Sequence, residues 1–201
     1  MTMNEIARLN KDYWTNRYKN NETGWDLGKI SAPIKNWFDK QKNKKLRILV
    51  PGSGYGHEVI YGYKSGFKNI FYMDFADDAT KKFKTLCPKF PETQIIKSSF
   101  FNYEPKKKFD IIIEHTFFCA QHPEKRTDYV DSAYKVLNKK GKLIGLLFNT
   151  EFQSNEPPFG GNVEDYKLIF NKKFELLIME DCESSIKPRL GSELWIEFIR
   201  K

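Results

Sequence analysis

The chain has 201 residues, of which 40% are hydrophobic and 30% charged, with a formal net charge of +8 at pH 7. This composition excludes a disordered chain and fits one folded domain of ordinary size. No stretch approaches the ~18 apolar residues of a membrane-spanning helix, and the polar start MTMNEIARLNKDYW lacks the apolar middle of a signal peptide. The cysteines, Cys87, Cys119 and Cys182, form neither a disulfide framework nor a CxxC metal pair. We therefore expect a cytoplasmic protein with no membrane partner and no metal.

The positive charge allows two interpretations, a nucleic-acid partner or a lysine-rich surface. Lysine clusters precede apolar runs of the sequence, at 44–45, 106–108, 139–140 and 172–173. Strand starts in a parallel sheet lie at the edge opposite the ligand crevice, so these lysines would not face a bound ligand. We therefore favour the lysine-rich surface and expect no nucleic-acid partner.

The segment before the first apolar run predicts two helices. Residues 4–20 are expected to form the first, because Ile6, Leu9 and Tyr13 recur roughly at helical spacing. A loop, NNETGWDLGK, follows it. We expect Ser31 to be the N-cap of the second helix, SAPIKNWFDKQ, with Pro33 in its first turn.

From residue 46 the sequence alternates between apolar runs and helical segments. Strands are expected at 46–51, 68–74, 93–98, 109–115, 141–149, 174–181 and 193–201. Helices are expected at 55–65, at 76–86, from Pro123 to about Leu137, and over VEDYKLIFN with Asn162 as its cap. Near-continuous apolar strands between helices indicate an α/β fold with a doubly wound parallel sheet covered on both faces. No linker or repeat interrupts the chain, so residues 1–201 are expected to form one domain, with 46–201 as its sheet core.

The spacing of the last two strands departs from an all-parallel sheet. Only eleven residues, 182–192, separate them, and CESSIKPRLGS contains Pro188 and Gly191 and is a poor helix. A parallel crossover needs about a dozen residues or more, so the last of the seven strands should return antiparallel. A doubly wound sheet that ends in this way points towards methyltransferases that depend on S-adenosylmethionine.

A glycine-rich turn, LVPGSGYGHE at 49–58, follows the first expected strand. Gly52, Gly54 and Gly56 let the backbone approach a ligand where any side chain would be in the way. A dinucleotide fingerprint would have glycine in place of His57, and a phosphate-binding loop would end in GK[ST], which YGHE does not supply. The G-x-G-x-G arrangement is the one seen for S-adenosylmethionine, whose methionine part and ribose the backbone would approach.

Residues at the ends of the next two strands extend the expected cofactor site. Asp74 ends the second strand, where a carboxylate can accept hydrogen bonds from both ribose hydroxyls, a feature that also fits NAD. The alternative is that Asp74 caps the helix at 76–86. Ser99 and Phe100 follow the third strand and would flank the adenine, Ser99 by a hydrogen bond and Phe100 by its apolar face. The alternative for Phe100 and Phe101 is a place in the core.

Several stretches of the sequence resemble the thiopurine S-methyltransferase superfamily, and most closely its halide and thiol methyltransferase branch. They are YWTNRYKNNETGWDLG near the start, LVPGSGYGHEV, SSFFNYEP, FDIIIEHTFFCAQHPEKR, PPF at 157–159 and SIKPRLG near the end. Together they span nearly the whole chain, and the N-terminal stretch and TFFCA are the specific ones. The resemblance implies a class I methyltransferase fold, S-adenosylmethionine as cofactor, and an N-terminal helical lid within residues 1–40 that folds over it.

The resemblance also implies a set of site residues. Trp14, Tyr18 and Trp25 would close the site, with Trp25 touching both the cofactor and the methyl acceptor. The implied cofactor contacts are these three aromatic residues together with Gly52, Gly54, Asp74, Ser99, Phe100 and His115. The implied acceptor contacts are Trp25, Phe118, Phe159 and Arg189, and the expected catalytic residues are His115 and Arg189.

Three of these residues have alternative roles that need no ligand. Trp14 could pack as part of an amphipathic helix, and His115 could be a hydrogen-bonded histidine at a strand end. Arg189 could pair with a carboxylate such as Glu193. His115 also departs from the family, which often has tyrosine or arginine at its position, so the acceptor stays open.

These features predict an enzyme that transfers a methyl group from S-adenosylmethionine to a small soft nucleophile: a thiol, a thiopurine or a halide ion. Such an in-line displacement needs alignment and the exclusion of water, which suits a chain with 17 Phe, 10 Tyr and 4 Trp. The motif [ND]-P-P-[YF] of enzymes that methylate adenine or glutamine amides is absent after the fourth strand, where EHTF stands. We expect a small-molecule methyl acceptor and a monomer. The alternative is a methyltransferase or binding module that acts on nucleic acid through its basic surface.

Overall fold

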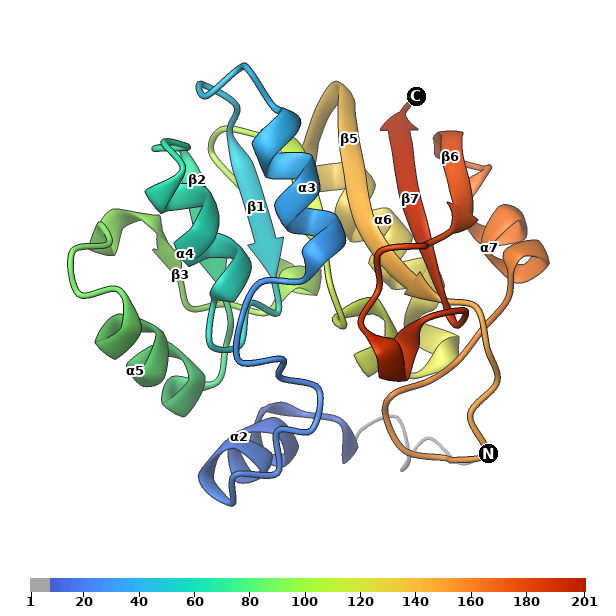
Figure 1. Cartoon of the computed structure of the whole chain (residues 1–201), viewed down its shortest axis with the longest axis horizontal. Coiled ribbons are helices and arrows are strands. Elements are labelled where there is room, and N and C mark those ends of the chain that lie inside the picture. The colour runs from blue at the N-terminus through green and yellow to red at the C-terminus, as the bar shows by residue number, and fades with distance from the viewer. Residues whose placement is uncertain (1–7) are drawn as a thin grey trace.

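The computed structural model describes residues 8–201, and a seven-stranded sheet in the order β3-β2-β1-β4-β5-β7-β6 forms its centre (Figure 1). The strands are β1 (Ile48–Pro51), β2 (Ile70–Met73), β3 (Ile95–Ile96), β4 (Phe109–Glu114), β5 (Leu137–Phe148), β6 (Phe174–Asp181) and β7 (Glu193–Arg200). The helices are α2 (Lys11–Lys19), α3 (Ala32–Lys40), α4 (His57–Lys64), α5 (Asp77–Leu86), α6 (Arg126–Val136) and α7 (Val163–Phe170). Short 3-10 turns are η1 (Glu92–Gln94), η2 (Phe100–Asn102), η3 (Phe118–Ala120), η4 (Pro123–Lys125) and η5 (Lys187–Arg189).

The strand directions confirm the doubly wound sheet with an antiparallel last strand. Strands β1 to β5 pair in parallel, whereas β7 runs antiparallel to both β5 and β6. The strand order reverses between β1 and β4, and the carboxyl ends of parallel strands open a ligand crevice at such a reversal. In Figure 1 the arrows of β1 and β5 point toward the side of the molecule where α2 lies, while the arrow of β7 points away from it.

Successive strand residues point to opposite faces of the sheet and feed two separate hydrophobic clusters. In β1, Leu49 belongs to one cluster, while Ile48 and Val50 belong to the other. The Leu49 cluster includes residues of α6 and α7 such as Phe170, and the second cluster includes residues of α3, α4 and α5 such as Phe38. Helices therefore cover both faces, as the near-continuous apolar strands predict. Within residues 8–201, no helix combines the length and the apolar character that crossing a bilayer requires.

Several elements of the core differ at their ends from the sequence-based predictions. The third strand, expected at 93–98, is only Ile95–Ile96, because the 3-10 turn η1 occupies the residues before it. The helix expected from Pro123 starts as the 3-10 turn η4 and becomes α6 at Arg126, and β5 begins earlier than expected, at Leu137. None of these differences changes the strand order.

The helix caps were predicted in part. The described part of the helix expected at 4–20 is α2, whose N-cap is Asn10, while Ile6 and the expected start lie outside the described residues. Ser31 is the N-cap residue of α3, but its buried hydroxyl makes no hydrogen bond within residues 8–201. Asn162 caps α7 as predicted, since its side chain accepts from a backbone N–H of the first turn.

Gly145 of β5 lies directly against the backbone of β4. Its φ is +145°, and a Cβ there would lie 1.9 Å from the carbonyl oxygen of Glu114. We expect Gly145→Ala to lower the free energy of unfolding by about 1–3 kcal/mol, because the two strand backbones would have to move apart. Urea denaturation measures this loss. Gly24→Ala is the control, since a Cβ at Gly24 meets nothing within 4 Å, and equal losses in the two variants would contradict the prediction.

Candidate active site

A cavity of about 500 Å³ lies at the carboxyl edge of the sheet, under α2. Three parts of the chain form its walls. The first is the ends of β1 and β2 with the residues after β3, and the second is α2 with the loop after it. The third is the turn after β4 together with the loop after β5 and the turn η5. Segments far apart in the sequence therefore enclose one space at the edge where the crevice is expected.

The glycine-rich turn after β1 has a left-handed backbone at each of its three glycines. Gly52, Gly54 and Gly56 have φ angles of +58°, +53° and +76°, a region that favours glycine. A Cβ on Gly52 would lie 2.2 Å from the ring of Phe117, and one on Gly54 would lie 2.9 Å from the Tyr18 hydroxyl. The turn needs glycine for its backbone and also because aromatic side chains from other parts of the chain approach it, including Phe83 at Gly56.

Asp74, just after β2, places a carboxylate on the cavity wall although the residue is only 8% exposed. Its Oδ1 accepts from the backbone N–H of Ala76 at 2.8 Å, and its Oδ2 accepts from that of Gly54 at 2.9 Å. Burial raises the pKa of Asp74, and these backbone bonds oppose the increase. A carboxylate offers about four acceptor positions, so room remains for donors such as ribose hydroxyls. A cap of α5 would explain the Ala76 bond but not the place of the carboxylate on the cavity wall.

Ser99 and Phe100 line the same cavity beside Asp74. Phe100 is only 2% exposed and also belongs to the hydrophobic core, where its ring meets Phe117 edge-to-face at 5.7 Å. The two interpretations of Phe100 are therefore compatible, since one face of a core side chain also forms part of the cavity wall.

The lid, which we define as residues 11–28, covers the cavity with aromatic side chains. The ring of Trp25 meets Trp14 at 5.4 Å and Tyr18 at 5.6 Å between centroids, both edge-to-face. The guanidinium carbon of Arg17 lies 5.6 Å from the centre of the Trp25 ring, within cation–π range. The three aromatic residues expected to close the site thus lie together on its wall.

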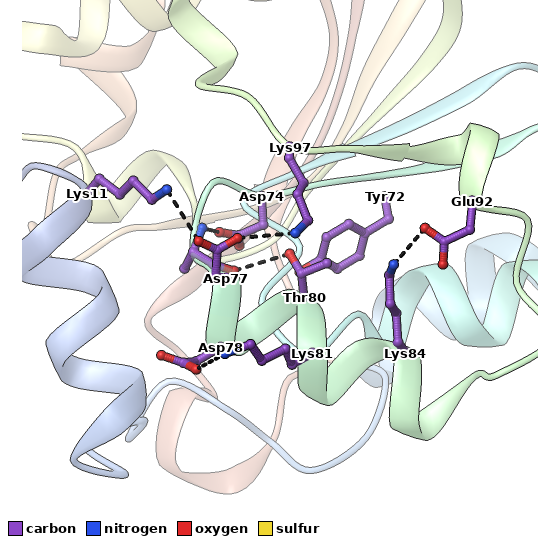
Figure 2. A network of polar contacts seen from close by, with 11 residues as sticks. Lys11, Tyr72, Asp74, Asp77, Asp78, Thr80, Lys81, Lys84, Glu92 and Lys97 are labelled. Carbon is purple, nitrogen blue, oxygen red and sulfur yellow. Dashed lines mark hydrogen bonds and ion pairs between the residues drawn. The ribbon is translucent and has the colours of Figure 1, made fainter.

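Polar contacts fasten the lid to the rest of the molecule. Figure 2 shows Lys11 of α2 reaching Asp77 at the start of α5 at 3.5 Å, and Lys97 reaching the same carboxylate at 3.1 Å. On the loop after α2, Asp26 lies 2.8 Å from His57 of α4. The lysine contacts are exposed and contribute little, whereas the Asp26 and His57 side chains are only 22% and 19% exposed.

Arg189 of the turn η5 places its guanidinium on the wall at another end of the cavity. Its Nη2 donates to the backbone carbonyl of Trp25 at 3.0 Å, and its Nη1 lies 3.4 Å from His115 Nε2. The expected alternative partner, Glu193, is also present, with its Oε1 3.5 Å from Arg189 Nη1. Arg189 therefore pairs with a carboxylate and faces the cavity at the same time. The centre of the Phe148 ring lies 5.7 Å from the Arg189 guanidinium carbon, and Phe117, Phe152, Pro157 and Pro158 are further apolar residues of the same cavity wall.

Eight of the twelve expected site residues line the cavity, and four do not. Those on the wall are Trp14, Tyr18, Trp25, Gly52, Asp74, Ser99, Phe100 and Arg189. Gly54 contributes its amide to Asp74 from behind the wall. His115 lies behind Arg189, with its Nδ1 3.1 Å from Glu58 Oε1.

Phe118 and Phe159, expected to contact the acceptor, are turned away from the cavity. Phe118 is 1% exposed and packs in the core, with its ring 5.0 Å from that of Tyr129. Phe117 takes its place on the wall, because Thr116 has a φ of +58° and ends the strand alternation there. Phe159 is 8% exposed, and its ring packs 5.4 Å from the His122 ring.

The sequence-based prediction did not include some residues of the cavity wall, although the helical spacing indicated two of them. Tyr13 and Arg17 line the cavity from the same helix as Trp14. Residues three and four apart share a helix face, so Arg17 belongs beside Tyr13 and Trp14. The two prolines before Phe159 carried no such signal, because their places depend on how the loop after β5 folds back. Phe148 reaches the wall as the last residue of β5.

Solved structures that are similar to this fold include two methyltransferases. The 1,6-didemethyltoxoflavin-N1-methyltransferase of Burkholderia thailandensis, solved with S-adenosylhomocysteine, matches with a TM-score of 0.80 and 13% identity over 100% of this chain and 91% of that chain. Magnesium protoporphyrin IX methyltransferase of Synechocystis, solved with bound S-adenosylmethionine, matches with a TM-score of 0.75 and 11% identity over 100% and 99% of the two chains. The strand order and these likenesses define a class I methyltransferase fold.

Sequence comparison identifies the family within this class. The family model of thiopurine S-methyltransferase matches residues 9–196. Probable thiol methyltransferase 2 of Arabidopsis thaliana is 34% identical over 185 residues, 90% of this chain and 81% of that protein. Thiocyanate methyltransferase 1 of Brassica oleracea is 28% identical over 184 residues, again 90% and 81% of the two chains. The chain belongs to the thiopurine S-methyltransferase family and is a methyltransferase that depends on S-adenosylmethionine.

The side chains of the cavity fit this cofactor. Asp74 has acceptor positions available for ribose hydroxyls, and Ser99 and Phe100 stand beside it for the adenine. Gly52 lies on the same wall at the end of β1, and because it has no side chain, a ligand can approach the backbone there. The assignment of each residue to a part of the cofactor stays a prediction.

We expect Asp74→Asn to weaken the binding of S-adenosylhomocysteine by about 1.5–3 kcal/mol, because a charge-assisted hydrogen bond to the ribose is lost. Isothermal titration calorimetry on the folded variant measures this affinity. Asp78→Asn is the matched control, since Asp78 lies in the first turn of α5 and pairs only with Lys81 among the described residues. Unchanged affinity in Asp74→Asn would remove this carboxylate from the cofactor site.

The contact between His57 and Asp26 predicts a pH dependence of stability. The hydrogen bond that His57 donates to Asp26 raises the pKa of His57 above its ordinary value of 6.5, with Glu58 adding a smaller electrostatic effect and burial opposing both. A raised pKa means that the charged histidine stabilises the folded state below pH 6.5 and that this stability is lost as the pH rises through the folded-state pKa. His57→Gln should therefore cost about 0.5–1 kcal/mol at pH 6 and less at pH 9.

Urea denaturation at the two pH values checks this difference. In an Asp26→Asn background the substitution of His57 should lose its pH dependence, because the partner charge is gone. A cost of His57→Gln that is the same at pH 6 and pH 9 would show that the ion pair does not hold the lid loop.

Proposed function

We propose that the enzyme transfers the methyl group of S-adenosylmethionine to a small, soft nucleophile that is anionic or readily ionised, such as a thiol, a thiopurine or a halide ion. The observation that carries this proposal is the charge of the cavity wall. Among the described residues of the wall, Arg17 and Arg189 are cations and Asp74 is the one carboxylate. If Asp74 serves the ribose, the acceptor meets positive charge and apolar rings. The names of the relatives, a thiol and a thiocyanate methyltransferase, support the same acceptor class.

This transfer depends more on positioning the nucleophile in line with the methyl group than on proton transfer. S-adenosylmethionine supplies a methyl group on a positively charged sulfur, from which an attacking nucleophile displaces it in line. The rings of Trp25, Phe117 and Phe148 exclude water from the wall, and an anion that has lost part of its hydration attacks more readily. Arg189 holds such an anion at a fixed place, so that the entropy cost of aligning it with the methyl group is met on binding, before the reaction.

Arg189 also suits an acceptor that must lose a proton first. A free thiol has a pKa of about 8.5 and is mostly protonated at neutral pH. A cation within a few ångströms favours the thiolate, and the carbonyl of Trp25 and the ring of His115 hold the Arg189 guanidinium in place. We propose that Arg189 contacts the acceptor and that His115 holds the Arg189 guanidinium in place.

The lid supports a small acceptor over a nucleic acid. α2 and Trp25 cover the cavity, which leaves little room for a polymer. Three of the four lysine clusters lie just before β1, β4 and β6, within three residues of the strand start. The fourth, 139–140, is in the first part of β5, so all four lie toward the edge opposite the cavity. A monomeric state and a cytoplasmic location stay predictions.

A turnover assay with purified enzyme and S-adenosylmethionine tests the proposal. The acceptors are iodide, bisulfide, thiocyanate, thiophenol and a thiopurine, with a short RNA as the competing substrate. We expect methylation of at least one small nucleophile and none of the RNA. Methylation of the RNA alone would overturn the proposal and favour the nucleic-acid alternative.

In the same assay we expect Arg189→Met to lower kcat/KM for the acceptor by about 10- to 100-fold, since a charge-assisted contact of about 1.5–3 kcal/mol is lost. The affinity for S-adenosylhomocysteine should change little. Lys187→Met is the matched control, because Lys187 is an exposed cation in the same 3-10 turn. Equal rates for Arg189→Met and the wild type would remove Arg189 from the acceptor site.

A further inference from the structure

Glu58 carries a carboxylate inside the protein, although it does not lie on the cavity wall. It is the second residue of α4 and is only 6% exposed. A buried carboxylate costs free energy unless donors satisfy it. Its Oε1 accepts from the backbone N–H of Ser31 at 3.4 Å and lies 3.1 Å from His115 Nδ1. The shorter of these two contacts leads toward the acceptor end of the cavity.

His115 has a different kind of partner at each ring nitrogen. Nδ1 faces the Glu58 carboxylate, and Nε2 faces Arg189 Nη1 at 3.4 Å. A guanidinium only donates hydrogen bonds, so its contact with Nε2 is favourable when that nitrogen carries a lone pair. The ring proton then belongs on Nδ1, where the carboxylate can accept it. The two partners together select one tautomer of the imidazole.

The state of Glu58 agrees with this assignment. Burial would raise the pKa of Glu58, but the contact with His115 and the hydrogen bonds from backbone N–H groups outweigh burial and hold the pKa below its ordinary value. Glu58 is therefore ionised at neutral pH and can only accept a hydrogen bond.

We propose that Glu58 is a positioning residue for methyl transfer, which keeps His115 as the Nδ1–H tautomer so that Nε2 accepts from Arg189 and holds the guanidinium at the cavity. This rests on the proposed function for the acceptor role of Arg189. The contacts form a line from α4 to the lid: Glu58, His115, Arg189 and the carbonyl of Trp25. Glu58 does not line the cavity, so its loss should affect the acceptor more than the cofactor.

The tautomer can be observed directly with Glu58→Gln. Long-range ¹H–¹⁵N spectra at pH 7 report which nitrogen of each of the three histidines carries the proton, and His115→Gln identifies the signals of that ring. We expect the Nδ1–H tautomer of His115 in the wild type. In Glu58→Gln a substantial fraction should shift to Nε2–H, because an amide can also donate to Nδ1. An Nε2–H or doubly protonated ring in the wild type, or an unchanged spectrum in the variant, would overturn the proposal.

Glu193→Gln is the matched control for the spectra. Glu193 is also a buried carboxylate and meets Arg189, but none of its hydrogen bonds or ion pairs among the described residues is to His115. We expect its substitution to leave the tautomer of His115 unchanged. A tautomer shift of the same size in Glu193→Gln would overturn the specific role of Glu58.

Kinetics then separate positioning from a merely structural role. With iodide and thiophenol as probes, Glu58→Gln should lower kcat/KM for the acceptor by about tenfold, the usual scale for a supporting hydrogen-bond partner. The affinity for S-adenosylhomocysteine should stay within about twofold of the wild type. Acceptor kinetics equal to the wild type, or an equal loss of acceptor and cofactor binding, would overturn the positioning role. If the wild type methylates neither probe, the proposed function fails, and the spectra, which need no turnover, still decide the tautomer.

Discussion

The parallel pairing of β1 with β2 and β4 is the constraint on which the rest of the structure depends. The register places Pro51 beside Met73, so β1 and β2 end at the same height. The turn after β1 can therefore reach the end of β2, where the Gly54 amide bonds Asp74. Ser53 strengthens the junction, since its hydroxyl donates to the Val50 carbonyl at 2.6 Å and accepts from a backbone N–H of β2 at 3.1 Å.

Buried carboxylates shape the site from behind its walls. Glu114, fully buried at the end of β4, accepts from the backbone N–H groups of Phe117 and Phe118 at 2.8 Å and from the Tyr129 hydroxyl at 2.5 Å. Burial raises the pKa of Glu114, although these bonds oppose the increase. The bonds fold the turn that sends one phenylalanine to the cavity and the next to the core. Glu58 has a comparable place behind the wall, but its partner is a side chain that reaches Arg189.

The distribution of charge separates the site from the basic surface. The net charge of +8 comes with lysine clusters that precede the strands or start them, at the edge away from the lid. At the opposite edge, aromatic rings enclose the cavity, and Arg17 and Arg189 supply its positive charge. The Arg189 side chain is only 12% exposed, which strengthens its contacts, because little water screens them. The basic surface and the positive charge of the cavity wall therefore have separate physical origins.

Features that depend on local patterns could be predicted from the sequence. Apolar periodicity predicted seven strands with helices between them, and the short connection 182–192 required an antiparallel last strand, because it is too short for a parallel crossover. The glycine turn and Asp74 followed from backbone geometry at strand ends. Only the tertiary structure decided that Phe117 and not Phe118 faces the cavity, since the left-handed Thr116 reverses the alternation. It also decided that Glu58 meets His115, because two side chains from different elements become neighbours only when β1 and β4 pair and bring α4 to the end of β4.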